Sequence, residues 1–95
     1  MKPVKITAWD PAEYLQSEEE ITSYLNEAFS TNDNQIIVAA IGDVARARGM
    51  GKVAEDAVCG RESLYKSLSK NGNPSFETVL KVMSALGYSL KPAQN

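Results

Sequence analysis

Apolar residues recur at helical spacing along much of the chain, and this spacing is the feature that most restricts the fold. From Ile21 to Phe29, and again from Ile37 to Val44, they follow i, i+3, i+4 and i+7, the pattern of a helix with one buried face. Two signals of helix starts come earlier, at Asp10-Pro11-Ala12-Glu13 and at Ser17-Glu18-Glu19-Glu20. Each has a capping residue followed three positions later by glutamate. We therefore predict an all-α fold of five to six helices.

Shorter patterns predict the remaining helices. A helix of about two turns is expected over 51–57, and another is expected to begin near Arg61 with Leu64 and Leu68 facing inward. After the turn signal at 71–74, Ser75 is expected to cap a last helix that ends at Gly87. Its predicted inner face consists of Phe76, Val79, Leu80, Met83 and Leu86.

Two brief stretches have extended character. They are Val4-Lys5-Ile6-Thr7 and Tyr88-Ser89-Leu90, and they could pair within one chain or between two chains.

Length and composition point to one domain that is not an enzyme. The 95 residues suit a single domain over 1–95, with an acidic helical extension at 1–30 and a core at 33–90. The sequence contains no histidine and one cysteine, so the usual general base and nucleophile pairs are missing. We expect no catalytic residues, no cofactor and no metal site. Neither an apolar run long enough for a bilayer nor a secretory signal is recognisable, so a cytoplasmic location is expected.

Charge is distributed unevenly along the chain. Residues 1–30 carry two lysines against six carboxylates, a net charge of −4, whereas residues 46–70 carry six basic and three acidic side chains, a net charge of +3. Such polarity suggests two different partners, although solvated helix faces would give the same pattern.

The stretch 50–69 has the pattern of a helix-turn-helix. Ala54 and Ala57 are small enough to let two short helices cross closely, while Val53, Cys59 and Leu64 supply the apolar inside of the corner. In such a motif the second helix lies in the major groove of DNA. The alternative is a helical corner that only packs and binds no DNA.

The outward face of that second helix supplies candidate DNA contacts. Arginine and lysine can pair with guanine, and glutamate can accept from cytosine or orient a neighbouring arginine. The candidate base-reading residues are Arg61, Glu62 and Lys66. The candidate phosphate-binding residues, which position a protein without reading sequence, are Lys52, Ser63, Ser69, Lys70, Asn71 and Asn73.

These features together resemble a known family. The region resembles the Cro/repressor-type helix-turn-helix domain, and the chain as a whole looks like the small addiction-module antidote proteins, antitoxins encoded beside a RelE/HigB-like ribonuclease toxin. The residues that carry the resemblance are Asp10 to Leu15, Ile21, Tyr24-Leu25, Ala45 to Met50, Ser63 to Leu68, Gly72-Asn73-Pro74, Thr78 and Ala85-Leu86-Gly87.

One residue departs from the general motif. Val58 stands where glycine usually adopts the left-handed conformation that ends the first helix, and a β-branched residue is strained there. Either the turn takes another route, using Gly60, or the domain tolerates the strain.

Several other residues have two readings each. Arg46 and Arg48 either complement the C-terminal dipole of their helix or bind phosphate or an acidic partner. Cys59 is expected to act as a small buried apolar residue rather than a redox switch. Trp9 and Tyr14 are expected to staple the first helix to the core rather than anchor a partner.

The resemblance implies the function. It implies a DNA-binding antitoxin that neutralises its toxin by direct binding and represses the shared operon, and a homodimer on a palindromic operator is expected. The toxin-facing candidates are Trp9, Tyr14, Glu18, Glu19 and Glu20. Two alternatives are a stand-alone transcription regulator and a protein-interaction module that has lost DNA binding.

Overall fold

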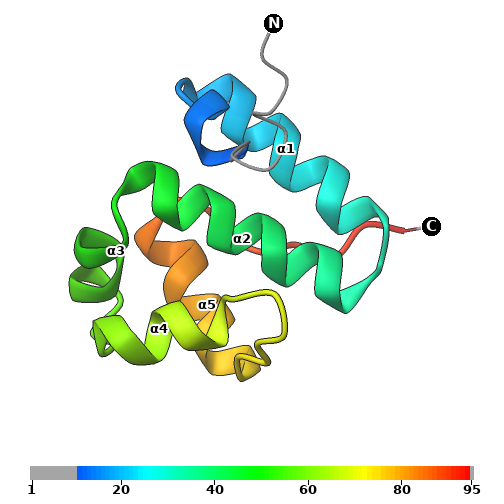
Figure 1. The fold of residues 1–95 in the computed structure, drawn as a ribbon. Helices are drawn as coiled ribbons and strands as arrows, with labels where there is room; N and C mark the ends of the chain where they lie inside the picture. The colour runs from blue at the N-terminus through cyan, green and yellow to red at the C-terminus, as the bar shows by residue number, and fades with distance from the viewer. Residues whose placement is uncertain (1–10, 95) are drawn as a thin grey trace, which may run out of the picture.

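The computed structural model describes residues 11–94, which form a bundle of helices (Figure 1). A 3-10 turn, η2 (Pro11–Tyr14), leads into α1 (Glu18–Ser30), α2 (Asn34–Arg48), α3 (Met50–Asp56), α4 (Arg61–Ser67) and α5 (Phe76–Ala85). This part of the chain has no strand, so the all-α prediction is confirmed and Tyr88–Leu90 does not form a strand within it. The stretch Val4–Thr7 lies outside the described residues.

The predicted capping signals form most of the helix starts. Ser17 Oγ accepts from the Glu20 N–H at 3.1 Å, and Glu20 Oε1 accepts in return from the Ser17 N–H at 3.1 Å, which is a complete capping box. Asp33 caps α2 and Ser75 caps α5, each through a side-chain oxygen that accepts from backbone N–H groups of the first turn. The earlier signal at Pro11 yields only one 3-10 turn rather than an α-helix, because the Ser17 box starts a new helix directly after it.

Helix α2 is the centre of the molecule (Figure 1). Ile41, Val44 and Ala45 are fully buried, with α1 packed along one side and α3 along another. A Cβ atom at Gly42 would lie 2.5 Å from the carbonyl oxygen of Leu68, so only glycine lets the end of α4 approach α2 this closely. No helix in the part of the chain that the structure describes is long and apolar enough to cross a membrane.

Polar contacts join α1 to the rest of the fold. Arg48 at the end of α2 donates to the carboxylate of Glu18, and the hydroxyl of Tyr24 donates to Asp43. The C-terminal segment passes behind α2 (Figure 1), and the hydroxyl of its Tyr88 hydrogen-bonds to that of Thr22 at 2.7 Å. Helix α1 is therefore an integral part of the bundle.

The predicted inner face of α5 is partly wrong. Met83 and Leu86 are buried and Val79 is half-buried, but Phe76 is 68% exposed and Leu80 is 43% exposed. Val82 is fully buried instead. Apolar residues cover more than one face of this helix, and periodicity alone cannot say which face meets the core.

Candidate nucleic-acid interface

Helices α3 and α4 form a tight corner over Met50–Ser67, called the corner below. Ala54 and Ala57 are buried at the point of close approach, and Val53 and Leu64 are buried inside it, as predicted. The corner lies under α2, so its apolar side is closed by the bundle core. Its outer side consists of the exposed residues of α4.

The turn of the corner passes through Val58 in a left-handed conformation, with φ at 57°. The Cys59 N–H donates to Ala54 O at 2.8 Å and the Val58 N–H donates to Glu55 O at 3.1 Å. These two bonds make a Schellman motif, in which glycine normally occupies the place of Val58. Gly60 has an extended backbone and serves as the N-cap of α4. The left-handed position of the turn is therefore occupied by Val58, the strained alternative of the two that the sequence left open. Such strain costs roughly 1–3 kcal/mol.

The Schellman motif also explains Cys59. This residue occupies the position after the left-handed residue, where an apolar contact back to the helix usually accompanies the motif. Cys59 is half-buried and packs against the core cluster. Its predicted role as a small apolar residue therefore agrees with its place in the turn.

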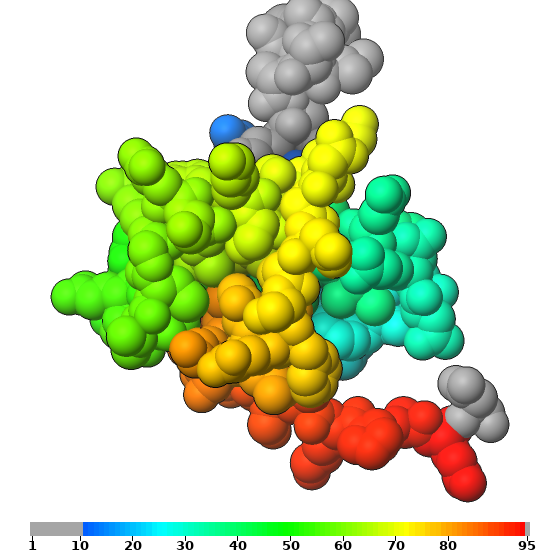
Figure 2. Space-filling model, turned by 90° about the horizontal axis from the view of Figure 1, so that it is seen from below, coloured from blue at the N-terminus to red at the C-terminus, as the bar shows by residue number. Residues whose placement is uncertain are grey.

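The structure places all three candidate base-reading residues at solvent-exposed positions of α4. Leu64 and Leu68 are buried beneath the helix, whereas Arg61, Glu62 and Lys66 are all exposed. Seen from the side of α4 and α5, the residues of α4 and the loop after it cover a continuous part of the surface (Figure 2).

Arg61 is held in place by two neighbours. Its guanidinium carbon lies 5.7 Å from the centre of the Tyr65 ring, within the range of a cation–π contact. On its other side, a Cβ atom built at Gly51 would lie 3.8 Å from Arg61 Nε. The side chain thus runs between α3 and the exposed ring of Tyr65, a residue that sequence reasoning missed because it looked only for charged readers.

The six candidate phosphate-binding residues are all exposed. Lys52 on α3 forms an ion pair with Asp56 at 3.3 Å, and Ser69 Oγ donates to the carbonyl of Lys66 at 2.8 Å. Exposed positions are also found for Ser63, Lys70, Asn71 and Asn73. Among residues 11–94, Lys66 and Lys70 form no ion pair, so their charges are available to a polyanion.

The acidic residues of α1 divide into two groups. Glu18 receives the guanidinium of Arg48 and faces the hydroxyl of Tyr88 at 3.4 Å, so its charge is used within the chain. Glu19, Glu20 and Glu27 line a shallow hollow with Ser23 and Tyr24; these three glutamates are called the acidic face below. Glu27 was not among the candidates, although its spacing of seven from Glu20 places it on the same side of the helix.

The structure also bears on the other two-way readings. Arg46 pairs with Asp43 at 2.6 Å and Arg48 with Glu18, so both arginines engage carboxylates of this chain. Tyr14 is 58% exposed, whereas the neighbouring Leu15 is buried in the core. Trp9 lies outside the described residues. Residues 11–94 contain no group of three metal-ligating side chains.

Comparisons with known proteins identify the family. The model of a family described as "Probable addiction module antidote protein" matches residues 5–94. An uncharacterized protein of Haemophilus influenzae is 51% identical over 87 residues, which cover 92% of this chain and 90% of that protein. No solved structure matches the chain. Since the family model spans nearly the whole sequence, the chain belongs to the family of probable addiction module antidote proteins.

Proposed function

We propose that this protein is an antitoxin that neutralises a RelE/HigB-like toxin by direct binding and represses its own operon as a DNA-bound homodimer. Membership of an antidote family implies a toxin partner. The DNA-binding part of the proposal rests on the corner, which has the form of a helix-turn-helix motif. Both activities place the protein in the cytoplasm.

The observation that carries the DNA-binding proposal is the exposure of Arg61 and Lys66 on α4, with Arg61 in contact with the Tyr65 ring. A guanidinium can bind the O6 and N7 atoms of guanine in the major groove with two parallel hydrogen bonds. Its contact with Tyr65 restricts the side chain before DNA arrives, so less conformational entropy is lost on binding. Arg61 and Lys66 are therefore the primary base-reading residues of this proposal.

Glu62 has a different role in the same surface. A carboxylate repels phosphate and weakens binding to arbitrary DNA, but it can accept a hydrogen bond from cytosine N4. Glu62 lies with Ser63, Tyr65 and Lys66 around one shallow hollow of the α4 surface. A reading surface with charges of both signs favours sequence selection over general affinity.

The toxin-binding part of the proposal places the toxin on α1. Ribonuclease toxins need a positively charged surface to bind RNA. The acidic face offers three glutamates on α1 to such a surface. Complementary charge would speed association and select a basic partner. Neutralisation and repression would then use separate surfaces of one chain.

Fluorescence anisotropy with the DNA upstream of the protein's own gene tests the regulatory part. At fixed salt, the wild-type protein should bind this DNA at least about 1000-fold more tightly than a scrambled duplex. Arg61→Ala and Lys66→Ala should each weaken operator binding, whereas Lys91→Ala, which removes the same charge from the C-terminal segment, should not. Equal affinity of the wild type for both duplexes would exclude a role as a transcription regulator and would favour the protein-interaction module.

Co-purification tests the toxin part. The product of the adjacent reading frame should remain bound to the tagged protein, and the variant Glu19→Lys should release it. If no neighbouring gene product binds while operator binding persists, the stand-alone regulator replaces the antitoxin. The two experiments therefore separate the three candidate functions.

A further inference from the structure

Two of the exposed large apolar side chains, Val58 and Leu80, line one groove. The groove, called the α5 groove below, runs between the turn of the corner and α5, and its walls are formed by Asp56, Ala57, Val58, Leu80, Lys81, Ser84 and Ala85. Val58 is 83% exposed and Leu80 43% exposed. Phe76, at 68% exposure, stands one helical turn before Leu80 on the same side of α5.

Contacts within the protomer do not explain why a valine stands at position 58. Its backbone is in the left-handed region, where a β-branched residue is strained, yet its side chain packs against almost nothing. Glycine would form the same turn without strain. An exposed valine in this position gains stabilisation only from contact with another molecule.

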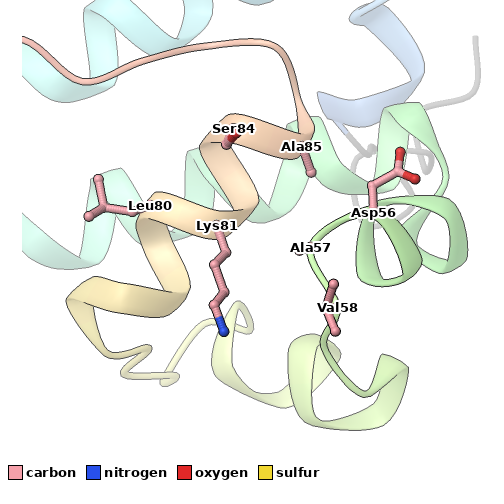
Figure 3. A pocket seen from close by; sticks show the side chains of 7 residues that line it. All are labelled: Asp56, Ala57, Val58, Leu80, Lys81, Ser84 and Ala85. Carbon is pink, nitrogen blue, oxygen red and sulfur yellow. The ribbon is translucent and has the colours of Figure 1, made fainter.

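The charges around the groove identify that molecule. Asp56 and Val58 lie on the corner side of the groove, and Leu80 and Lys81 lie on α5. Lys81 extends toward Val58, whereas Leu80 points to the other side of α5 (Figure 3). The groove therefore carries one charge of each sign and no net charge. DNA would require a basic surface, and a basic toxin would require an acidic one, whereas a face with paired opposite charges is complementary to itself.

We propose that the α5 groove is the homodimer interface, and that a second copy of this chain occupies it in a two-fold arrangement. Leu80 and Phe76 of each protomer pack against Val58 of the other, and Lys81 of each protomer pairs with Asp56 of the other. The ion pairs that these two residues make within the protomer, Lys52–Asp56 and Glu77–Lys81, are exposed and weak enough to exchange.

In a dimer formed through this interface, the two α4 helices would lie near each other. Helix α4 begins three residues after Val58, so a two-fold axis near Val58 holds both α4 helices close to the axis. Two half-sites on one side of a duplex require such a pair of reading helices. The inference rests on the homodimer of the proposed function and adds the surface that forms it.

Analytical ultracentrifugation without DNA tests the interface, using charge-reversal variants. In Asp56→Lys homodimers two lysines face each other, and in Lys81→Glu homodimers two carboxylates do. Each variant alone should therefore dissociate at concentrations where the wild type is dimeric. In an equimolar mixture both pairs are restored between different chains, so the mixture should form heterodimers with near wild-type affinity.

Apolar variants provide the second measurement. Phe76→Ser and Leu80→Glu should each raise the dimer dissociation constant roughly 30-fold or more, the effect of a central interface residue. Leu90→Ser, a partly buried apolar residue of the C-terminal segment, is the matched control and should leave it unchanged. Circular dichroism establishes that each variant is folded, and Phe76, the more exposed of the two, remains informative if Leu80→Glu unfolds.

The outcomes separate this inference from the proposed function. Association of all variants with wild-type affinity, or a wild type that stays monomeric at millimolar concentration, overturns the α5 groove as the interface. Failure of operator binding with an intact, groove-dependent dimer overturns the regulatory proposal and leaves the interface standing. Mixtures of the two charge variants that stay monomeric exclude the Lys81–Asp56 pairing.

Discussion

Helices α1 and α4 both have charged outer faces, but more of the charged side chains of α1 make contacts that stabilise the fold. Glu20 completes the capping box of α1, and Glu18 holds Arg48. All three first-turn glutamates also interact favourably with the positive end of the helix dipole. On α4, Arg61 lies against the Tyr65 ring and close to Gly51, and among residues 11–94 neither Arg61 nor Lys66 forms an ion pair.

The difference shows how to rank two candidate binding surfaces. A charge that caps a helix or joins two elements has a structural reason for its presence, so it is a weak indicator of function. A charge without such a contact, placed on a helix that the core holds rigidly, is a stronger indicator. By this criterion α4 is the stronger candidate for a binding surface, and on α1 Glu19 and Glu27 are the next candidates.

The largest expected effect is on DNA binding through α4. The double variant Arg61→Ala with Lys66→Ala should weaken operator binding by about 2–4 kcal/mol, since each base contact is worth roughly 1–3 kcal/mol. Binding to scrambled DNA should fall much less. Anisotropy titrations at one salt concentration measure both values.

The matched control for that variant lies on α1. Glu19→Gln with Glu27→Gln changes the net charge without touching the corner, so the preference for operator over scrambled DNA should stay the same. An equal loss of preference from the α1 variant would show that α4 has no special role.

The second effect concerns toxin binding through the acidic face. Glu19→Lys with Glu27→Lys should weaken the complex with the toxin by about 1–3 kcal/mol, because two attractive contacts become repulsive. Calorimetric titration measures the affinity. Lys66→Ala serves as the control with an intact acidic face, and a toxin affinity that falls for Lys66→Ala instead would place the toxin on α4.

The third effect concerns the N-caps of α1 and α4. Ser17→Ala removes half of the capping box and should lower the free energy of unfolding by about 1 kcal/mol, as measured by urea denaturation. Helix α4 has Gly60 at its N-cap without a side-chain cap. Glycine is still preferred over alanine at an N-cap, so Gly60→Ala should cost about 0.5 kcal/mol, less than Ser17→Ala. Equal losses would show that capping does not distinguish the two helices.

The smallest effect concerns the strained turn. Val58→Gly should raise the unfolding free energy of the isolated protomer by about 0.5–1 kcal/mol, because relief of the left-handed strain exceeds the added chain entropy of glycine. The measurement is urea denaturation at concentrations below the dimer dissociation constant. A large loss of protomer stability would show instead that Val58 packs within its own chain.

The sequence was sufficient to predict the corner and the caps, because both depend on local rules. Ala54, Ala57 and Leu64 are buried as their spacing predicts, and Ser17 and Ser75 cap the helices that they precede. The exposure of Arg61, Glu62 and Lys66 followed from the inward positions of Leu64 and Leu68. Periodicity fixes relative faces within one helix, and this was enough for α4.

Features that depend on long-range packing could not be predicted. Periodicity could not place Phe76 and Leu80 outside the core, because α5 has apolar residues on two faces. The ion pair of Arg48 with Glu18 joins residues 30 positions apart, beyond the reach of local patterns. Whether Val58 or Gly60 formed the turn was also undecided, since the choice depends on strain that the rest of the fold tolerates.

Titration of isotope-labelled protein with its own upstream DNA, followed by amide NMR shifts, tests the central claim most directly. The account predicts large shift changes for amides 61–70, with those of α1 (Glu18–Ser30) unchanged, and no such pattern with scrambled DNA. Shift changes concentrated on α1, or spread evenly over the molecule with both duplexes, would contradict the assignment of α4 as the surface that reads DNA.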